Sequence, residues 1–397
     1  MTLSGRPLII ALCIGQVGNL VPHVAVSAIM AGHLIPLWGL SATEAGIMAS
    51  SYTVGYMLAV PILATLTDRF DARLILLAGS ALNFAGAIAF GLFANGFWSA
   101  CLLWGLTGIG FGGAYMPGLK ALTDRMPPGE SSRGVVFYTS AYSFGVGLSF
   151  LVSQVVADAW GWRAAFFVTG IPPLLMVVTA FLLTPVRPAT QGAKIAIRPV
   201  LRNRPALGYI LGYGAHCFEL YGVRTWIVAF WTFVLANNPG NNLLSPIAVS
   251  VIVTVIAAPA SILGNEAALR FGRHRVLTVV MTTSAIVTAM VGILAGASPW
   301  ILLPLIILQA FTVNADSGAL TSGMTIAAVP ENRGATMALH STVGFGLAAS
   351  GGWASGAAID LGGGQMTTFG WTLAFLVMGA VVALGPLALA WSRRPPS

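Results

Sequence analysis

The sequence predicts an all-α integral membrane protein with twelve transmembrane helices in two pseudo-symmetric six-helix bundles. Of its 397 residues, 57% are hydrophobic and only 8% are charged, whereas soluble domains carry roughly 25% charged residues. The hydrophobic residues form continuous runs of about 20, the length of a helix that crosses the hydrocarbon core. They do not alternate with polar residues, as the strands of a membrane β-barrel would.

The apolar runs place the twelve spans near residues 7–31, 43–66, 73–94, 97–123, 134–157, 164–184, 206–235, 246–267, 276–296, 299–325, 334–358 and 369–391. The first run is longer than the core of a signal peptide and lacks a clear cleavage site, so we expect it to be the first span. Ser41 and Glu44 have the spacing of a capping box at the start of the second. The three cysteines lie inside predicted spans, which indicates small apolar residues and no disulfide frame.

The net charge of +8 is distributed almost entirely to one side of the predicted membrane. Sixteen of the nineteen Lys and Arg residues fall in that set of loops: Arg6, Arg69, Arg73, Arg125, Arg133, Arg187, Lys194, Arg198, Arg202, Arg204, Arg270, Arg273, Arg275, Arg333, Arg393 and Arg394. The positive-inside rule then places both termini in the cytoplasm. A charge that orients helices in this way does not indicate a nucleic-acid partner; the predicted partner is the lipid bilayer.

The two halves of the chain resemble each other at a shift of about two hundred residues. Arg69-Phe70 corresponds to Arg270-Phe271, and Arg133-Gly134 corresponds to Arg333-Gly334, each in the equivalent loop. Such a parallel repeat is typical of transporters. We therefore expect an N-terminal six-helix bundle over residues 1–184, a basic, proline-containing cytoplasmic linker over 185–205, and a C-terminal six-helix bundle over 206–397.

The loop between the second and third spans, residues 64–73, carries a family resemblance. Leu66, Asp68, Arg69 and Arg73 match the signature loop of the major facilitator superfamily, and the chain resembles that superfamily in topology over its whole length. Ala64, Asp71 and Ala72 depart from the signature. The resemblance implies that Asp68, with Arg69 or Arg73, forms a cytoplasmic gate between the two halves; the alternative is that these residues only orient the helices.

The fifth span lacks the Gly-Pro motif of drug-proton antiporters in this superfamily, because Ser143 to Gly147 contain no proline. This lowers the expectation of a drug exporter. Glycines in the fourth span, Gly108, Gly110, Gly112 and Gly113, have the spacing of close helix contacts. No Walker lysine and serine follow them, so we expect packing and not a phosphate loop.

Polar stripes mark the first and tenth spans. Gln16, Asn19 and His23 share one helical face of the first, and Gln309, Thr312 and Asp316 have the same spacing in the tenth. Such stripes line a water-filled cavity or join helices by hydrogen bonds. In the superfamily that the chain resembles, helices one, four, seven and ten line the central cavity, which favours the first alternative.

The seventh span contains His216, Glu219 and Arg224 within an apolar run. Charged residues at that depth cost at least about 2.5 kcal/mol each, so they indicate a functional site. His216 and Glu219 share a face. Glu219 is either a proton carrier next to His216 or a structural partner of Arg224. Arg224 corresponds to the position of His23 in the repeat, and we prefer it as the substrate contact.

Asp316 has no basic residue three or four positions away, which suits a group that loads and unloads a proton. Its alternative is a hydrogen bond to a neighbouring helix. His340 and Lys120 are weaker candidates, and Lys120 would snorkel from its position near the helix end. We find no convincing metal site or catalytic triad: His216 and the adjacent Cys217 project in different directions.

The sequence therefore predicts a secondary active transporter, not an enzyme, that needs no cofactor and works by alternating access. We expect proton coupling through Glu219 or Asp316 and a small organic or inorganic anion as substrate, bound by Arg224, His23, His216, Asn19 and Gln16. The alternatives are a proton-driven exporter of lipophilic or cationic compounds and a non-transporting receptor or enzyme. We expect a monomer in a bacterial inner membrane.

Overall fold

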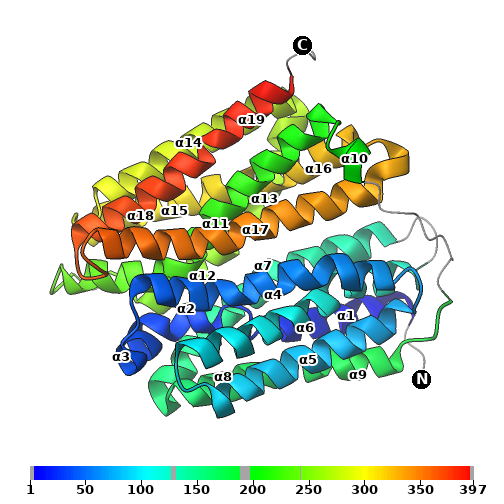
Figure 1. Ribbon diagram of the computed structural model, residues 1–397, viewed down its shortest axis with the longest axis horizontal. Coiled ribbons are helices and arrows are strands. Elements are labelled where there is room, and N and C mark those ends of the chain that lie inside the picture. The colour runs from blue at the N-terminus through cyan, green and yellow to red at the C-terminus, as the bar shows by residue number, and fades with distance from the viewer. Residues whose placement is uncertain (1–3, 127–130, 188–196, 242, 394–397) are drawn as a thin grey trace. The chain divides into compact units, whose positions relative to one another are not determined.

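The computed structural model describes residues 4–126, 131–187, 197–241 and 243–393, and every regular element in these ranges is helical (Figure 1). Ten helices in them are long and apolar enough to cross a membrane, or eleven with one bent pair. Helix α17 (Arg333–Leu361) occupies the predicted eleventh span, but its many glycines, alanines and serines make it less apolar. The predicted fold class is confirmed.

Two compact units divide the chain: Met1–Gly39 with Ser51–Ala193, and Leu40–Ser50 with Lys194–Ser397. The first half of the chain contains α1 Gly5–Leu20, α2 Ala25–Ile29, the π-helix η1 Met30–Leu34, α3 Ile35–Trp38, α4 Ala42–Leu66, α5 Ala72–Phe93, α6 Phe97–Thr123, α7 Ser131–Trp160, α8 Trp162–Gly170 and α9 Leu174–Leu182. The second half contains α10 Ile197–Val200, α11 Arg204–Ala236, α12 Pro246–Val255, α13 Ala257–Phe271, α14 Arg273–Ile293, α15 Pro299–Ala315, α16 Ser317–Ala327, the 3₁₀ turn η2 Pro330–Asn332, α17, α18 Thr368–Val382 and α19 Leu384–Ser392.

The short helix α10 lies inside the predicted linker. Residues 188–196, with Lys194, and the terminal Arg394 lie outside the described residues, so the predicted linker boundaries stay a prediction.

The first turn of α4 is capped as the sequence predicts. Ser41 N donates to Glu44 Oε2 over 2.9 Å, and Glu44 N donates to Ser41 Oγ over 3.1 Å, which completes the capping box. This turn belongs to the second unit, where the carboxylate of Asp360 at the end of α17 accepts the N–H groups of Ala42 and Thr43 over 2.9 and 2.7 Å. An anion at a helix N-terminus is stabilised by the unpaired N–H groups there.

Several spans are broken along their length, and two of these breaks lie at predicted site residues. Leu20 ends α1 before Pro22, and α2 continues at Ala25, with a bend of 47° between Gly5–Leu20 and Ala25–Trp38. The proline cannot donate to the helix ladder, and the freed N–H of Val24 donates to Ser149 Oγ. The second break separates α15 from α16 at Asp316. His23 and Asp316 thus lie at breaks, where backbone groups and side chains become available.

Glycines permit very close helix contacts in the first unit. A Cβ atom built at Gly108 would lie 1.9 Å from Tyr52 O on α4, and one at Gly110 would lie 2.3 Å from Asn83 N on α5. These contacts are with backbone atoms, so a side chain would force the helices apart. The prediction that the glycines of the fourth span serve packing is confirmed.

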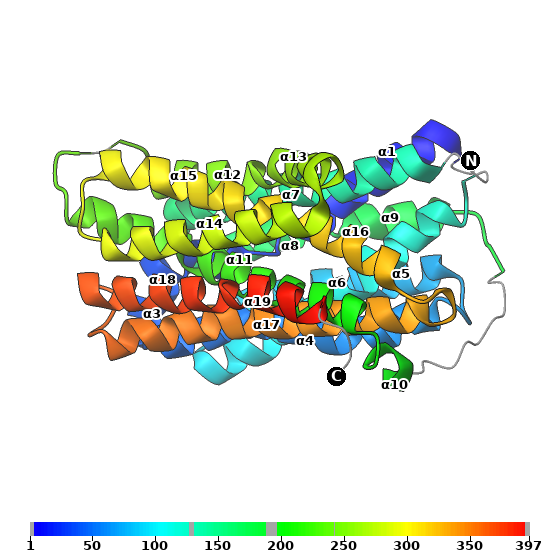
Figure 2. The same ribbon diagram turned by 90° about the horizontal axis from the view of Figure 1, so that it is seen from above.

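Helix α11 is the central helix of the second unit. Of its most apolar window, 78% is buried, against 33–56% for the other candidate spans. Figures 1 and 2 show α17 running along it, and α16, α18 and α19 also pack against it. Its polar side chains therefore face other helices of the same unit.

Candidate functional site

Glu219 on α11 lies in a fully buried polar cluster of the second unit. Its side chain is 0% exposed. Ser284 Oγ, from α14, donates to its carboxylate over 2.9 Å, Gln309 Nε2, from α15, donates to Oε1 over 3.1 Å, and Thr288 Oγ1 donates to Oε1. Each of these partners is neutral. The carboxylate is therefore held in place by neutral donors, and no basic side chain is among its described hydrogen-bond partners.

His216, one turn before Glu219, faces Asp316. Its Nδ1 lies 2.7 Å from Asp316 Oδ1, and the side chains are 2% and 1% exposed. The other carboxylate oxygen, Asp316 Oδ2, is buried with no hydrogen-bond partner within the described residues. This oxygen is available to a proton. The sequence had predicted a lone Asp316 without a basic neighbour on its own helix, and the partner comes from α11.

The polar stripe of the tenth span meets the polar residues of the seventh span in the second unit. Gln309 of the span-ten stripe bonds Glu219, and Asp316 of the same stripe pairs with His216. Thr312 Oγ1, of the same stripe, donates to Ser284 Oγ over 3.3 Å. The two predicted proton sites are therefore neighbouring groups of buried polar side chains, since His216 and Glu219 lie one turn apart on α11. We call His216, Glu219 and Asp316 with their partners the network.

Arg224 lies five residues after Glu219, toward the C-terminal end of α11. The Cζ atom of its guanidinium is 5.0 Å from the ring centroid of Tyr221, at cation–π distance. Neutral groups from α14 and α15 supply the described hydrogen bonds of Glu219. This arrangement favours the alternative in which Arg224 serves a ligand and not Glu219, and that assignment stays a prediction.

In the first unit, Gln16 and Asn19 are 0% exposed and bond neighbouring helices. Tyr138 OH donates to Gln16 Oε1 over 2.8 Å. Asn19 Nδ2 donates to Ser80 Oγ over 3.0 Å, and Asn83 Nδ2 donates to Asn19 O over 2.9 Å. Asn19 therefore joins its helix to α5 by hydrogen bonds. Its role as a substrate contact stays a prediction.

His23 lies at the break of the first span among aromatic side chains. Its Nε2 is 3.1 Å from Tyr142 OH. Its ring centroid lies 4.9 Å from that of Tyr52 and 5.3 Å from that of Phe111. The imidazole is 7% exposed. No periodic pattern in the sequence distinguishes Tyr52 and Tyr142 from core aromatics, so their place beside His23 was not predicted.

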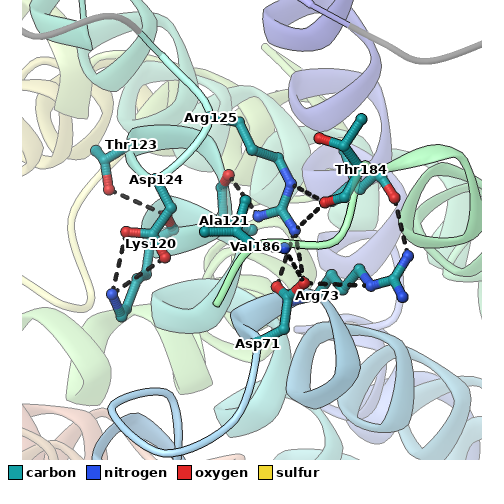
Figure 3. Close-up of polar contacts among 10 residues, drawn as sticks. Asp71, Arg73, Lys120, Ala121, Thr123, Asp124, Arg125, Thr184 and Val186 are labelled. Carbon is teal, nitrogen blue, oxygen red and sulfur yellow. Dashed lines mark hydrogen bonds and ion pairs between the residues drawn. The ribbon is translucent and has the colours of Figure 1, made fainter. Parts of the chain in front are cut away.

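The three predicted gate residues have different surroundings in the first unit. Asp68 and Arg69 are exposed, whereas Arg73 is bonded to Asp71, the residue that departs from the family signature. Figure 3 shows Arg125 reaching Asp71 with Nη2, at 2.8 and 3.0 Å from the two carboxylate oxygens. The same guanidinium donates through Nε to Thr184 O over 2.9 Å. The role of Asp68 and Arg69 in gating stays a prediction.

Asp71 ties three segments together. It caps α5 by accepting from Arg73 N over 3.0 Å, and it accepts from Val186 N over 2.8 Å (Figure 3). Burial alone would raise the pKa of this carboxyl, but the hydrogen bonds from Arg125, Val186 and Arg73 outweigh it and lower the pKa. We call Asp71, Arg73, Arg125, Thr184 and Val186 the Asp71 anchor. The sequence contained a signal for it, since Asp71 departs from the signature of the loop.

The weaker candidates occupy different surroundings. Lys120 Nζ lies 3.1 Å from Asp124 Oδ1 at the end of α6 (Figure 3), as a lysine near a helix end does. His340 of α17 stacks on Tyr213 with ring centroids 4.0 Å apart, and Tyr213 lies 5.6 Å from His216. Within the described ranges no three His, Cys, Asp or Glu side chains are grouped to hold a metal ion.

Comparisons with known proteins agree with this fold. A family model described as Major Facilitator Superfamily matches residues 9–264. The Bacillus subtilis hexuronate transporter is 25% identical over 239 residues, 56% of this chain and 56% of that protein. The 4-hydroxybenzoate transporter of Acinetobacter baylyi is 25% identical over 148 residues, 37% of this chain and 32% of that protein. The matched part of this chain thus spans a third to just over half of these relatives' length.

A solved structure is similar over nearly the whole chain. It is a bacterial homologue of the human lysosomal transporter Spinster in an inward-facing, unoccupied conformation, with a TM-score of 0.78 and 16% identity, covering 99% of this chain and 100% of that one. At this identity the likeness concerns the fold. The resemblance drawn from the signature loop is confirmed.

Proposed function

Because this chain belongs to the Major Facilitator Superfamily, whose model matches residues 9–264, we propose that it is a secondary active transporter and not an enzyme. It moves a small anion together with protons by alternating access. The network of His216, Glu219 and Asp316 carries this proposal. Titratable groups buried in a membrane-spanning bundle are costly to maintain, and they mark ion pathways and proton relays.

The proton step follows from the contacts of the network. Asp316 Oδ2 lacks a hydrogen-bond partner within the described residues, so a proton can be added there without breaking a bond. Once protonated, Asp316 no longer stabilises a charged His216 2.7 Å away. Glu219 lies one turn further along α11 and feels the change in charge. A change of charge at one of these side chains therefore acts on the others.

The substrate is an anion in this proposal because cationic groups accompany the network. Arg224 follows on the same helix and presents a guanidinium over Tyr221, and a guanidinium binds a carboxylate with two parallel hydrogen bonds. His216, on the same helix, is a second contact; the role of His23, in the first unit, stays a prediction. The names of two relatives, a hexuronate and a 4-hydroxybenzoate transporter, are those of carboxylate carriers, which supports the same class.

We place the protein in the bacterial inner membrane as a monomer with both termini in the cytoplasm. The distribution of sixteen of nineteen basic residues over one set of loops supports this orientation.

Uptake into proteoliposomes tests the proposal. The purified protein is reconstituted and supplied with radiolabelled glucuronate, 4-hydroxybenzoate or phosphate, with and without an imposed pH gradient. We expect one of these anions to accumulate only with the gradient, and accumulation to be lost in Asp316→Asn and in Arg224→Ala. Glu266→Gln, at an exposed site of α13, is the matched control. Extrusion of lipophilic cationic dyes without anion flux would establish the drug-exporter alternative instead.

A further inference from the structure

The first unit contains two aromatic clusters of different chemistry. One consists of Phe90, Trp104, Trp162 and Phe166, with Phe90 and Phe166 only 4.0 Å apart between centroids. The other, which we call the hydroxyl cluster, consists of Tyr52, Tyr56, Tyr115, Tyr138 and Tyr142 around Phe111 and His23. Core packing is the evident role of the first cluster. The second adds five phenolic hydroxyls at a place where packing does not need them.

Polar groups in a membrane-spanning bundle must find partners, because an unpaired buried hydroxyl or amide costs about 1–3 kcal/mol. Tyr138 OH of the hydroxyl cluster is paired with Oε1 of the adjacent Gln16. Two described donors, one in the cluster and one on Gln16, have no such partner. Within the described residues, Tyr52 OH and Gln16 Nε2 are buried without a hydrogen-bond partner, and their residues are 2% and 0% exposed.

Both of these groups can donate a hydrogen bond, and the amide nitrogen can only donate. They occupy the two ends of the cluster. Tyr52 packs on His23 at 4.9 Å and on Trp104 at 5.2 Å, whereas Gln16 is bonded to Tyr138. Between them, Tyr115 and Tyr142 are only half-buried and lie 5.6 Å apart between centroids. A ligand entering past these two rings would meet aromatic faces and edges with a donor toward either end.

This composition discriminates between cyclic anions. A sugar acid carries a hydroxyl on nearly every ring carbon, and each one needs a polar partner when it is buried. Among the described residues, the hydroxyl cluster and the adjacent Gln16 offer five tyrosine rings and these two donors. A planar aromatic ring needs few partners and gains edge-to-face contacts of about 0.5–1.5 kcal/mol each.

We propose that the hydroxyl cluster is the subsite for the aromatic ring of the transported anion, which makes the substrate an aromatic carboxylate and not a sugar acid. The hydroxyl of Tyr52 and the amide of Gln16 donate to acceptor oxygens on that ring. This inference rests on the proposed anion transport and specifies its substrate class.

Tyr52→Phe gives the sharpest test, because it removes one oxygen and keeps the ring. If the cluster were only a core, deleting an unpaired buried hydroxyl would leave the protein equally or more stable and its ligand binding unchanged. As a ring subsite, it loses one hydrogen bond to the ligand. We then expect the Kd for 4-hydroxybenzoate, measured by calorimetry on the detergent-purified protein, to rise about 3- to 10-fold. Phe166→Leu in the other cluster is the control, with an unchanged Kd.

The possible outcomes separate the two proposals. Binding and pH-driven uptake of 4-hydroxybenzoate, both weakened by Tyr52→Phe, support the subsite. Uptake of glucuronate with no binding of 4-hydroxybenzoate overturns the subsite and leaves proton-coupled anion transport standing. If Tyr52→Phe weakens the binding of 4-hydroxybenzoate but a pH gradient does not drive its uptake, the subsite is supported and the proton coupling is overturned. An unchanged Kd in Tyr52→Phe overturns the role of Tyr52.

Discussion

In the second unit, Nδ1 of His216 lies 2.7 Å from Oδ1 of Asp316, and neither side chain is more than 2% exposed. Removing one member of such a pair leaves the other buried without its partner, which costs about 3–5 kcal/mol, whereas replacing both by neutral residues costs much less. We expect His216→Asn to lower the free energy of unfolding by this amount. The double substitution His216→Asn with Asp316→Asn should recover most of it. Thermal unfolding in detergent measures both, and additive losses would contradict the pairing.

Glu219→Gln should abolish proton-driven accumulation of the substrate and keep substrate exchange across the membrane. The amide oxygen can still accept from Ser284 and Thr288, so the free energy of unfolding should fall by less than about 1.5 kcal/mol. A glutamine cannot load or release a proton. Substrate counterflow should therefore persist while accumulation driven by a pH gradient is lost. Gradient-driven accumulation at the wild-type level in Glu219→Gln would assign proton coupling to Asp316 alone.

The Asp71 anchor predicts a pH-dependent contribution to stability. Asp71→Asn removes charge-assisted bonds to Arg125, whose side chain is 2% exposed, so we expect a loss of about 1.5–3 kcal/mol at pH 7. Because the pKa of Asp71 is lowered on folding, this contribution is fully present above the unfolded pKa of about 3.9 and disappears as the pH falls through the folded value.

The difference in melting temperature between wild type and Asp71→Asn should accordingly stay constant from pH 7 to 5 and shrink below pH 4. Asp124→Asn provides the control, because its ion pair with Lys120 is more exposed, at 24% and 33%, and such pairs contribute at most about 1 kcal/mol. Equal losses in the two variants would exclude a special role for Asp71.

Asp68→Asn tests the predicted gate. Asp68 is exposed in the first unit, so the substitution should leave the melting temperature unchanged. If Asp68 stabilises one conformation of the transport cycle, the turnover rate should fall several-fold while the substrate Kd is retained. Asp158→Asn, another exposed aspartate, serves for comparison. Wild-type turnover in Asp68→Asn would leave Asp68 with a role in orientation only.

The sequence predicts the helices of this protein well and their contacts less well. Lengths and apolar runs located the ten helices that can cross a membrane, the bent pair and α17, since crossing a bilayer constrains each helix separately. Periodicity also selected His216, Glu219 and Asp316. It could not pair His216 with Asp316, one hundred residues apart, because the partner depends on how α11 and α15 pack. Ser284 and Thr288 were missed for the same reason: hydroxyls are common in spans, and only the arrangement of the helices in the second unit brings these two from α14 to Glu219.

All partners of Asp71 in its anchor precede residue 187, whereas Asp360, which caps the start of α4, comes near the end of the chain. A membrane protein is synthesised from its N-terminus, and its domains fold as they emerge. The bonds that close one end of the first unit are therefore complete before α11 to α19 have been made. The N-terminus of α4 is capped only after Asp360 at the end of α17 has been synthesised. The order of synthesis therefore makes the first turn of α4 the last part of that helix to be stabilised.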